Sequence, residues 1–215
     1  QTAAIDCDFE RQDAFTFTTE PSGVAEIRRE ADAAARAGLL AEFTLDVELP
    51  ISIRGAVRLA NQAQFDPYRF CVGVARVFVE EGGKIVEQTR ATDVRRDDPC
   101  VVKTDRGDIR AEHVVLATLI PFMDQGGFFV RAFPSRSYAV AAKLAGSEPS
   151  APSGMYINVE SPVRSVRPLP GRRGILVVGE DHKVGHDADT RRRYSALESW
   201  TREHFEVAHF THRCS

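Results

Sequence analysis

The sequence predicts an α/β protein in which a mixed, largely antiparallel sheet is interrupted by a segment typical of a parallel sheet. Short alternating or apolar runs, bounded by turn residues, recur along the chain and indicate strands. Two longer segments repeat apolar residues with helical periodicity. Residues 113–118 are nearly all apolar or β-branched, as expected of a strand that is buried on both faces.

The first part of the chain predicts a strand, a helix and a second strand. Residues 8–18 alternate phenylalanines with polar side chains. Pro21 and Ser22 open a helix that begins at Val24 and ends at Gly38, a residue type common just after helices. Residues 42–48 alternate again and predict the second strand.

A second helix is predicted after a short strand at residues 55–59. Asp66 provides an N-cap and Pro67 the first helical position, since proline has no N–H to leave unpaired there. The apolar face of this helix contains Phe70, Cys71, Val74, Val77 and Phe78, and glycines at 82–83 end it.

The middle of the chain predicts a return into a parallel sheet. A short strand is expected at residues 84–88, and turns near residues 97–99 and 105–108 predict two hairpins. The buried strand at residues 113–118 follows. A helix, a short strand, a hairpin and a doubly buried strand together favour a helix-covered parallel sheet.

The last part predicts four more strands and a final helix. The strands are expected at residues 135–144, 155–159, 163–167 and 175–178, and the helix at residues 189–205. These strands, like those before residue 64, are typical of an antiparallel sheet that is separate from the parallel one.

Composition and charge exclude several classes of function. The chain has 215 residues and a net charge of −3, which gives no reason to expect a nucleic acid or a membrane surface as a partner. No apolar run approaches the roughly 18 residues of a membrane span. The four cysteines are widely spaced, which predicts reduced thiols in a cytoplasmic protein. Both ends of the sequence suggest a piece of a longer protein.

Four stretches in a fixed order resemble the D-amino-acid-oxidase-like family of FAD-dependent oxidoreductases, which includes the glycine and sarcosine oxidases. The resemblance covers nearly the whole chain and is nearest to a branch that often carries a Rieske iron–sulfur domain at its C-terminus. The stretches are residues 64–67 with 82–85, residues 87–94, residues 107–118, and residues 136–138 with 179–183.

The resemblance implies an α+β substrate domain and an incomplete, Rossmann-like FAD-binding portion. Residues 1–63 and 121–215 would form the substrate domain, and residues 64–120 the FAD-binding part. It assigns cofactor contacts to Ala91, beside the adenine, and to Ala117, Thr118 and Leu119, beside the phosphates or ribose. Ligands of open α/β sheets bind beyond the carboxyl ends of strands, which suits the second position.

The main dinucleotide motif is missing from the sequence. It requires the pattern GxGxxG between a strand and a helix, so that backbone N–H groups meet the pyrophosphate, and no glycines here have that spacing. The resemblance therefore predicts that the full-length parent binds FAD and oxidises a C–N bond of an amine or amino acid. The chain by itself is expected to be inactive. The alternative is a non-catalytic domain that binds a substrate or a partner.

The candidate substrate-binding residues are Tyr138, Arg164 and Arg167, on strands expected to belong to the substrate sheet. A guanidinium can hold a carboxylate through two hydrogen bonds, and a tyrosine can add one more, although arginines on strands are usually solvated. No catalytic nucleophile or base is recognisable. His182 and His186 could suggest a metal site, but a polar loop after a strand is favoured and no metal is expected.

Overall fold

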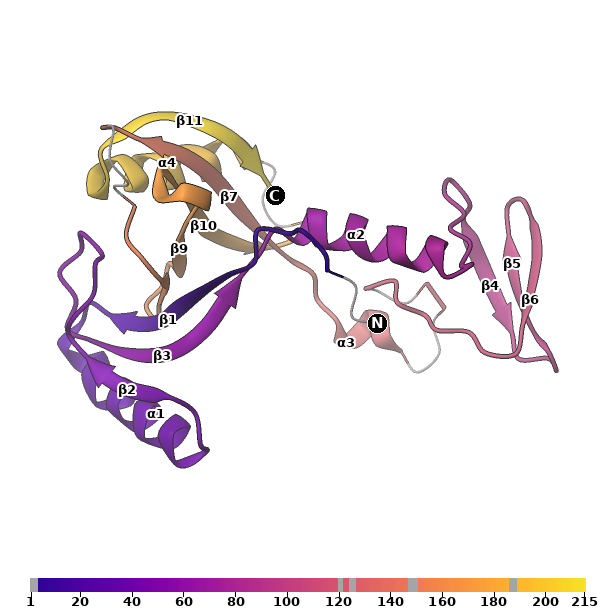
Figure 1. The fold of residues 1–215 in the computed structure, drawn as a ribbon, viewed down its shortest axis with the longest axis horizontal. Helices are drawn as coiled ribbons and strands as arrows, with labels where there is room; N and C mark the ends of the chain where they lie inside the picture. Colours follow the sequence, from indigo (N-terminus) through magenta and orange to yellow (C-terminus); the bar gives the residue numbers. More distant parts are fainter. Residues whose placement is uncertain (1–3, 120–121, 124–126, 147–150, 186–188) are drawn as a thin grey trace. The chain divides into compact units, whose positions relative to one another are not determined.

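The computed structural model describes residues 4–119, 122–123, 127–146, 151–185 and 189–215 (Figure 1). The chain divides into two compact units. One contains Gln1–Ile5 and Cys71–Pro134, and the other contains Asp6–Phe70 and Ser135–Ser215. Each unit has its own sheet, of eight strands in the larger unit and three in the smaller.

The eight-stranded sheet has the order β11-β7-β10-β9-β8-β1-β3-β2. Only the β1–β8 pair is parallel among the pairings of this sheet in the described residues, so the predicted mixed, largely antiparallel sheet is confirmed. The strands are β1 (Glu10–Thr18), β2 (Ala41–Thr44), β3 (Gly55–Gln64), β7 (Ser135–Leu144), β8 (Met155–Asn158), β9 (Arg164–Pro168), β10 (Gly174–Lys183) and β11 (Val207–Cys214).

Two helices pack on opposite faces of this sheet (Figure 1). Helix α1 (Val24–Arg36) buries Ile27 and Ala31 against Val57 of β3. Helix α4 (Thr190–His204) buries Leu197 in the main core, which includes Phe15 of β1. Since Val57 pairs with Thr16, the neighbour of Phe15, the two helices cover opposite faces.

The main core lies between α4 and the centre of the sheet. Tyr138, Val140, Ile175 and Val177 are almost wholly buried there, on alternate positions of β7 and β10. The predicted helix at 189–205 is confirmed, and the Asp189 side chain caps it by accepting from Arg192 N–H.

The lengths of several strands differ from the predictions. β3 continues to Gln64 because it pairs with β1 along its whole length, whereas β2 ends at Thr44. β11 was not predicted. It pairs with β7 through two register shifts, and such bulges break the alternation by which a strand is recognised in sequence.

The smaller unit contains most of α2 (Pro67–Glu80), three strands and α3 (Phe128–Arg131). Strands β4 (Ala91–Arg95), β5 (Cys100–Thr104) and β6 (Gly107–Ala111) form the two predicted hairpins. The predicted cap of α2 is also confirmed, because Asp66 Oδ1 accepts from the N–H groups of Tyr68 and Arg69 at 2.9 and 3.0 Å.

The predicted parallel-sheet strands are wrong for this chain. Residues 84–88 and 113–118 are described and form no strand, and Val115 is 88% exposed. A strand needs hydrogen-bonded neighbours on its edges, and neither sheet of the described residues includes these two segments as strands. Helix α2 likewise has no buried residue, although its sequence has an apolar face.

None of the helices in the described residues is long and apolar enough to cross a membrane.

Candidate substrate-binding surface

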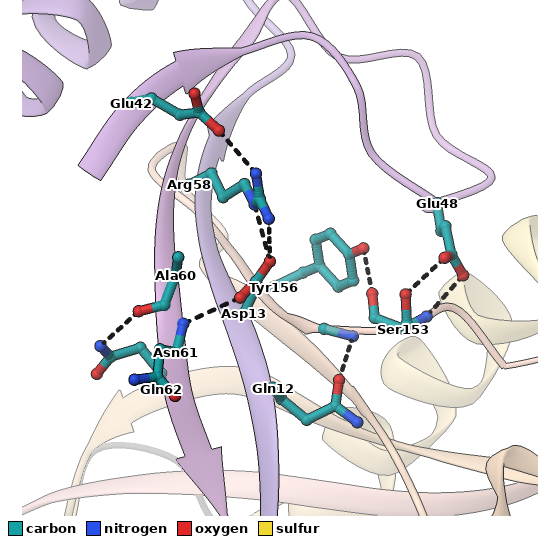
Figure 2. Close-up of polar contacts among 11 residues, drawn as sticks. Gln12, Asp13, Glu42, Glu48, Arg58, Ala60, Asn61, Gln62, Ser153 and Tyr156 are labelled. Carbon is teal, nitrogen blue, oxygen red and sulfur yellow. Dashed lines mark hydrogen bonds and ion pairs between the residues drawn. The ribbon is translucent and has the colours of Figure 1, made fainter. Parts of the chain in front are cut away.

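A cluster of charged residues joins β1, β2 and β3 where β3 bulges opposite Asp13 (Figure 2). Arg58 contacts Asp13 at 2.7 Å and Glu42 at 2.7 Å. The second oxygen of Asp13 accepts from the N–H of Asn61, which has a positive φ of 59°. Burial alone would raise the pKa of Asp13, but hydrogen bonds from Arg58 and Asn61 leave it lowered. These contacts therefore favour the charged form of Asp13, which shares the Arg58 guanidinium with Glu42.

A second group of contacts ties the segment before β3 to the start of β8 (Figure 2). Glu48 accepts from the N–H of Ser153 at 2.8 Å and from its hydroxyl at 2.5 Å, and Arg172 approaches it at 2.7 Å. Tyr156 donates to the carbonyl of Ser153. Burial raises the pKa of Tyr156 to about 12, so this hydroxyl stays protonated at neutral pH.

These groups border an open cavity of about 510 Å³ whose polar groups are mostly paired with one another. Gln12 accepts from the N–H of Gly154, and Arg11 donates to the carbonyl of Asn61. A ligand would have to displace these contacts. The lining residues are Arg11, Gln12, Asp13, Phe15, Ala60, Asn61, Ser153 and Gly154.

A second cavity, of about 480 Å³, lies where β1 begins and where β3 and β9 end. It contains Arg167, for which the described part of the chain provides no hydrogen bond or ion pair. Gln64 also lines it and is only 8% exposed. The Gln64 Nε2 group donates to Glu10 at 3.0 Å, but its Oε1 atom has no partner in the structure. Arg167 is half-buried at this cavity, whereas Gln64 Oε1 is buried from solvent.

The predicted substrate residue Tyr138 is part of the core. It is wholly buried, its ring stacks on His182 at 5.6 Å, and it meets Tyr194 edge-on at 5.0 Å. Its hydroxyl has no hydrogen-bond partner in the described residues. The position beneath α4 gives Tyr138 no accessible surface for a ligand in this structure.

Arg164 and Arg167 lie on opposite faces of β9, because they are three residues apart on one strand. Arg164 is paired with Glu180 at 2.6 Å, and its guanidinium lies 5.3 Å from the centre of the Trp200 ring. It borders a third cavity of about 290 Å³. The structure therefore does not bring Tyr138, Arg164 and Arg167 into one site, and Arg167 is the arginine without an acidic partner.

The residues expected to contact FAD lie in the smaller unit. Ala91 begins β4 opposite Thr104. Ala117, Thr118 and Leu119 lie outside the strands with exposed side chains, and Leu119 is 99% exposed with a φ of 61°. These residues offer backbone groups and do not enclose a cofactor, so their role stays a prediction.

The predicted loop around His182 is wrong in part. β10 continues to Lys183, and His182 pairs with Arg136 of β7 after a register shift. A bulge with Glu180 at a φ of 57° allows the strand to continue through a polar sequence that is typical of a loop. His186 lies outside the described residues. Within the part of the chain that is described, no three His, Cys, Asp or Glu side chains are grouped as a metal site.

Comparison with known proteins identifies the family of this chain. Residues 1–214 match the model of the family described as DAO, FAD dependent oxidoreductase. The chain belongs to this family. It is 30% identical over 197 residues to the Rieske 2Fe-2S iron-sulfur protein YhfW of Bacillus subtilis (strain 168), covering 90% of this chain and 38% of that protein.

Solved structures of glycine oxidases share the fold. The enzyme from Geobacillus kaustophilus superposes with a TM-score of 0.74 at 16% identity, over 96% of this chain and 59% of its own. The enzyme from Bacillus cereus ATCC 14579 gives a TM-score of 0.71 at 18% identity, over 97% and 61%. The chain thus spans about three fifths of the length of these glycine oxidase structures, and less than half of YhfW.

Sequence reasoning missed the polar groups that line the two larger cavities. Residues 64–67 contain the predicted helix start and belong to the family resemblance, but nothing in their sequence shows that Gln64 would be buried. Asp13 and Arg58 are brought together only by the pairing of β1 with β3. A long-range pairing of this kind has no local signal.

The hydrogen bonds to Glu48 predict a loss of stability in acid. Ser153, followed by Arg172, holds the pKa of Glu48 below its ordinary value despite partial burial. A carboxyl with a lowered folded-state pKa stabilises the fold above its unfolded pKa, and this contribution disappears as the pH falls through the folded value. At pH values below about 4.5 we expect the urea concentration at the unfolding midpoint to decrease, and to decrease less for Glu48→Gln. An identical acid profile for the variant would contradict this.

Proposed function

We propose that the full-length protein is an oxidoreductase that uses FAD to oxidise a C–N bond of an amine or amino acid. Family membership over residues 1–214 supports the cofactor, and the glycine oxidase fold of the chain agrees with it. The observation that carries the substrate side is Arg167, an arginine without an acidic partner at a cavity on the eight-stranded sheet.

The chain divides these tasks between its segments in this proposal. Residues 1–63 and 121–215 provide the substrate domain, and residues 64–120 add part of the FAD-binding domain, with backbone contacts at Ala91 and residues 117–119. A bound flavin would accept the hydride from the carbon next to nitrogen, and water would hydrolyse the resulting imine. The residues of this chain would position the substrate and exclude water from it.

A second candidate is a domain that binds a substrate or partner without holding FAD. The exposed apolar side chains of helix α2 and of Val115 favour this for the 215 residues by themselves. In a longer protein both descriptions hold, because the remaining chain would provide the pyrophosphate-binding loop. The match to YhfW makes a Rieske domain a reasonable electron acceptor in that protein.

Flavin content separates the two candidates. We expect the 215-residue chain to purify without flavin absorbance at about 450 nm, a general property of the cofactor, because the chain lacks the GxGxxG loop. We expect the full-length protein to be yellow and to lose its flavin colour when a substrate amine or amino acid is added without oxygen. A colourless full-length protein would contradict the proposed function. One flavin per 215-residue chain would contradict the division of tasks.

A further inference from the structure

The eight-stranded sheet has an open edge at β2 (Figure 1). Within the described residues, β2 is the last strand of the sheet and pairs with β3 alone. The carbonyl of Leu40 accepts from the N–H of Ala60 on β3 at 2.9 Å. Because the backbone groups of successive strand residues alternate between the two edges, the N–H and C=O of Phe43 point away from β3. An open strand edge of this kind is a template for pairing with another chain.

Apolar side chains and helix α1 border the same edge. Leu39, Leu40 and Leu45 flank β2, and each is more than half exposed. The guanidinium of Arg28, an exposed residue of α1, lies 3.6 Å from the centre of the Phe43 ring on β2. The side of α1 that contains Arg28 therefore faces the open edge, and a chain that paired with β2 would meet this side of the helix as well.

This side of α1 has a row of exposed residues at alternating spacings of three and four. Residues with this spacing form one stripe along a helix, and the same spacing forms the seam between paired helices. We call this row the α1 seam; it consists of Ala25, Arg28, Asp32 and Ala35. Among the described residues, no acid pairs with Arg28 and no base pairs with Asp32. The seam therefore has two charges without partners, one of each sign.

The α1 seam is complementary to itself when two copies run antiparallel. A two-fold axis beside the middle of the helix places Arg28 of each copy opposite Asp32 of the other, so that both charges are paired twice. The same axis places Ala25 opposite Ala35, and these small side chains allow the two helices to approach closely. Charge complementarity thus favours a second copy of this chain as the partner.

The strand edge fits the same two-fold axis. An axis at Phe43 pairs its outward N–H and C=O groups with those of the other copy and places Glu42 opposite Thr44, whereas an axis at Glu42 would place two carboxylates opposite each other. Since Arg28 lies over Phe43, this axis also passes near the middle of α1. Helix α1 packs over both β2 and β3, so a strand spacing of about 4.8 Å puts the two α1 axes about 10 Å apart, a distance typical of packed helices.

We propose that two copies of this protein form a two-fold dimer through their β2 edges and their α1 seams. The dimer joins the two eight-stranded sheets into one continuous sheet and covers the leucines that flank β2. This inference goes beyond the proposed function, because the surface needs neither flavin nor substrate. The dimer and the oxidase activity can therefore fail separately.

Sedimentation velocity of the full-length protein tests the dimer directly. Measurements from about 1 to 100 μM cover the range in which interfaces of modest size associate. We expect the mass of two chains at the upper end of this range. A protein that sediments as one chain at every concentration would overturn the proposal.

Charge reversals locate the interface on the α1 seam. Arg28→Asp and Asp32→Arg each place like charges opposite each other twice, so each is expected to weaken dimerisation at least about tenfold. The double variant exchanges the two charges and restores both pairs, so its dimer should be within about threefold of the original in affinity. Glu30→Arg is the matched control, because it makes the same change of charge on the opposite side of α1, and it should leave dimerisation unchanged.

Thermal unfolding followed by circular dichroism shows whether each variant is folded. Asp32→Arg removes no ion pair or hydrogen bond among the described residues, so we expect it to unfold at the same temperature as the original protein. A dimer that is unaffected by Asp32→Arg would overturn the proposal, because its interface would lie elsewhere. A folded double variant that dimerises as weakly as the single variants would also overturn it.

Discussion

Replacing Leu197 with alanine is expected to lower the free energy of unfolding of the eight-stranded unit by about 2–5 kcal/mol, the range for a buried leucine. Leu197 is wholly buried and lies where α4 meets the sheet. Its removal leaves a cavity where α4 packs on β7 and β10, whose backbones are fixed by strand pairing on both sides and cannot collapse to fill it.

The single tryptophan makes this measurement specific to the larger unit. Trp200 follows Leu197 by one turn of α4, so its fluorescence during urea unfolding reports on this helix. Leu45→Ala is the matched control, because Leu45 is 62% exposed and its truncation should change stability by less than about 0.5 kcal/mol. Equal effects of the two truncations would show that α4 is not packed as described.

Replacing Glu180 with glutamine is expected to cost about 3–5 kcal/mol, the range for breaking a buried ion pair from one side. The side chains of Arg164 and Glu180 are 17% and 12% exposed, and their charged atoms are 2.6 Å apart. Arg193 approaches the same carboxylate at 4.0 Å. Without the acid, the Arg164 guanidinium is left beside Trp200 with no other carboxylate among the described residues.

A double variant shows whether Glu180→Gln destabilises the fold by leaving Arg164 unpaired or by disrupting the fold in general. Arg164→Met combined with Glu180→Gln leaves neither charge unpaired, so it should recover much of the stability lost by Glu180→Gln alone. The exposed pair of Arg95 and Asp97 provides the control, and Asp97→Asn should cost less than about 1 kcal/mol. A double variant less stable than Glu180→Gln would argue that the pair is not coupled.

Local patterns predicted most of the elements correctly. Alternation predicted β1, helical periodicity predicted α1 and α4, and the Asp66–Pro67 pair predicted the start of α2. These signals are local, because burial on one face of a helix or strand repeats with the period of that element. The segment at residues 113–118 shows the limit of this reasoning. Its composition is that of a buried strand, yet composition cannot provide the neighbouring strands that bury it.

The same distinction applies to the candidate site. The sequence by itself determined the family, the mixed sheet, the caps and turns, and the absence of the GxGxxG loop. Tertiary structure alone decided that Tyr138 is core, that Arg164 is neutralised by Glu180, and that Arg167 meets Gln64 at a cavity. The physical reason is that these relations join residues far apart in the chain through strand register. A shift of one residue in that register would exchange the faces of Arg164 and Arg167.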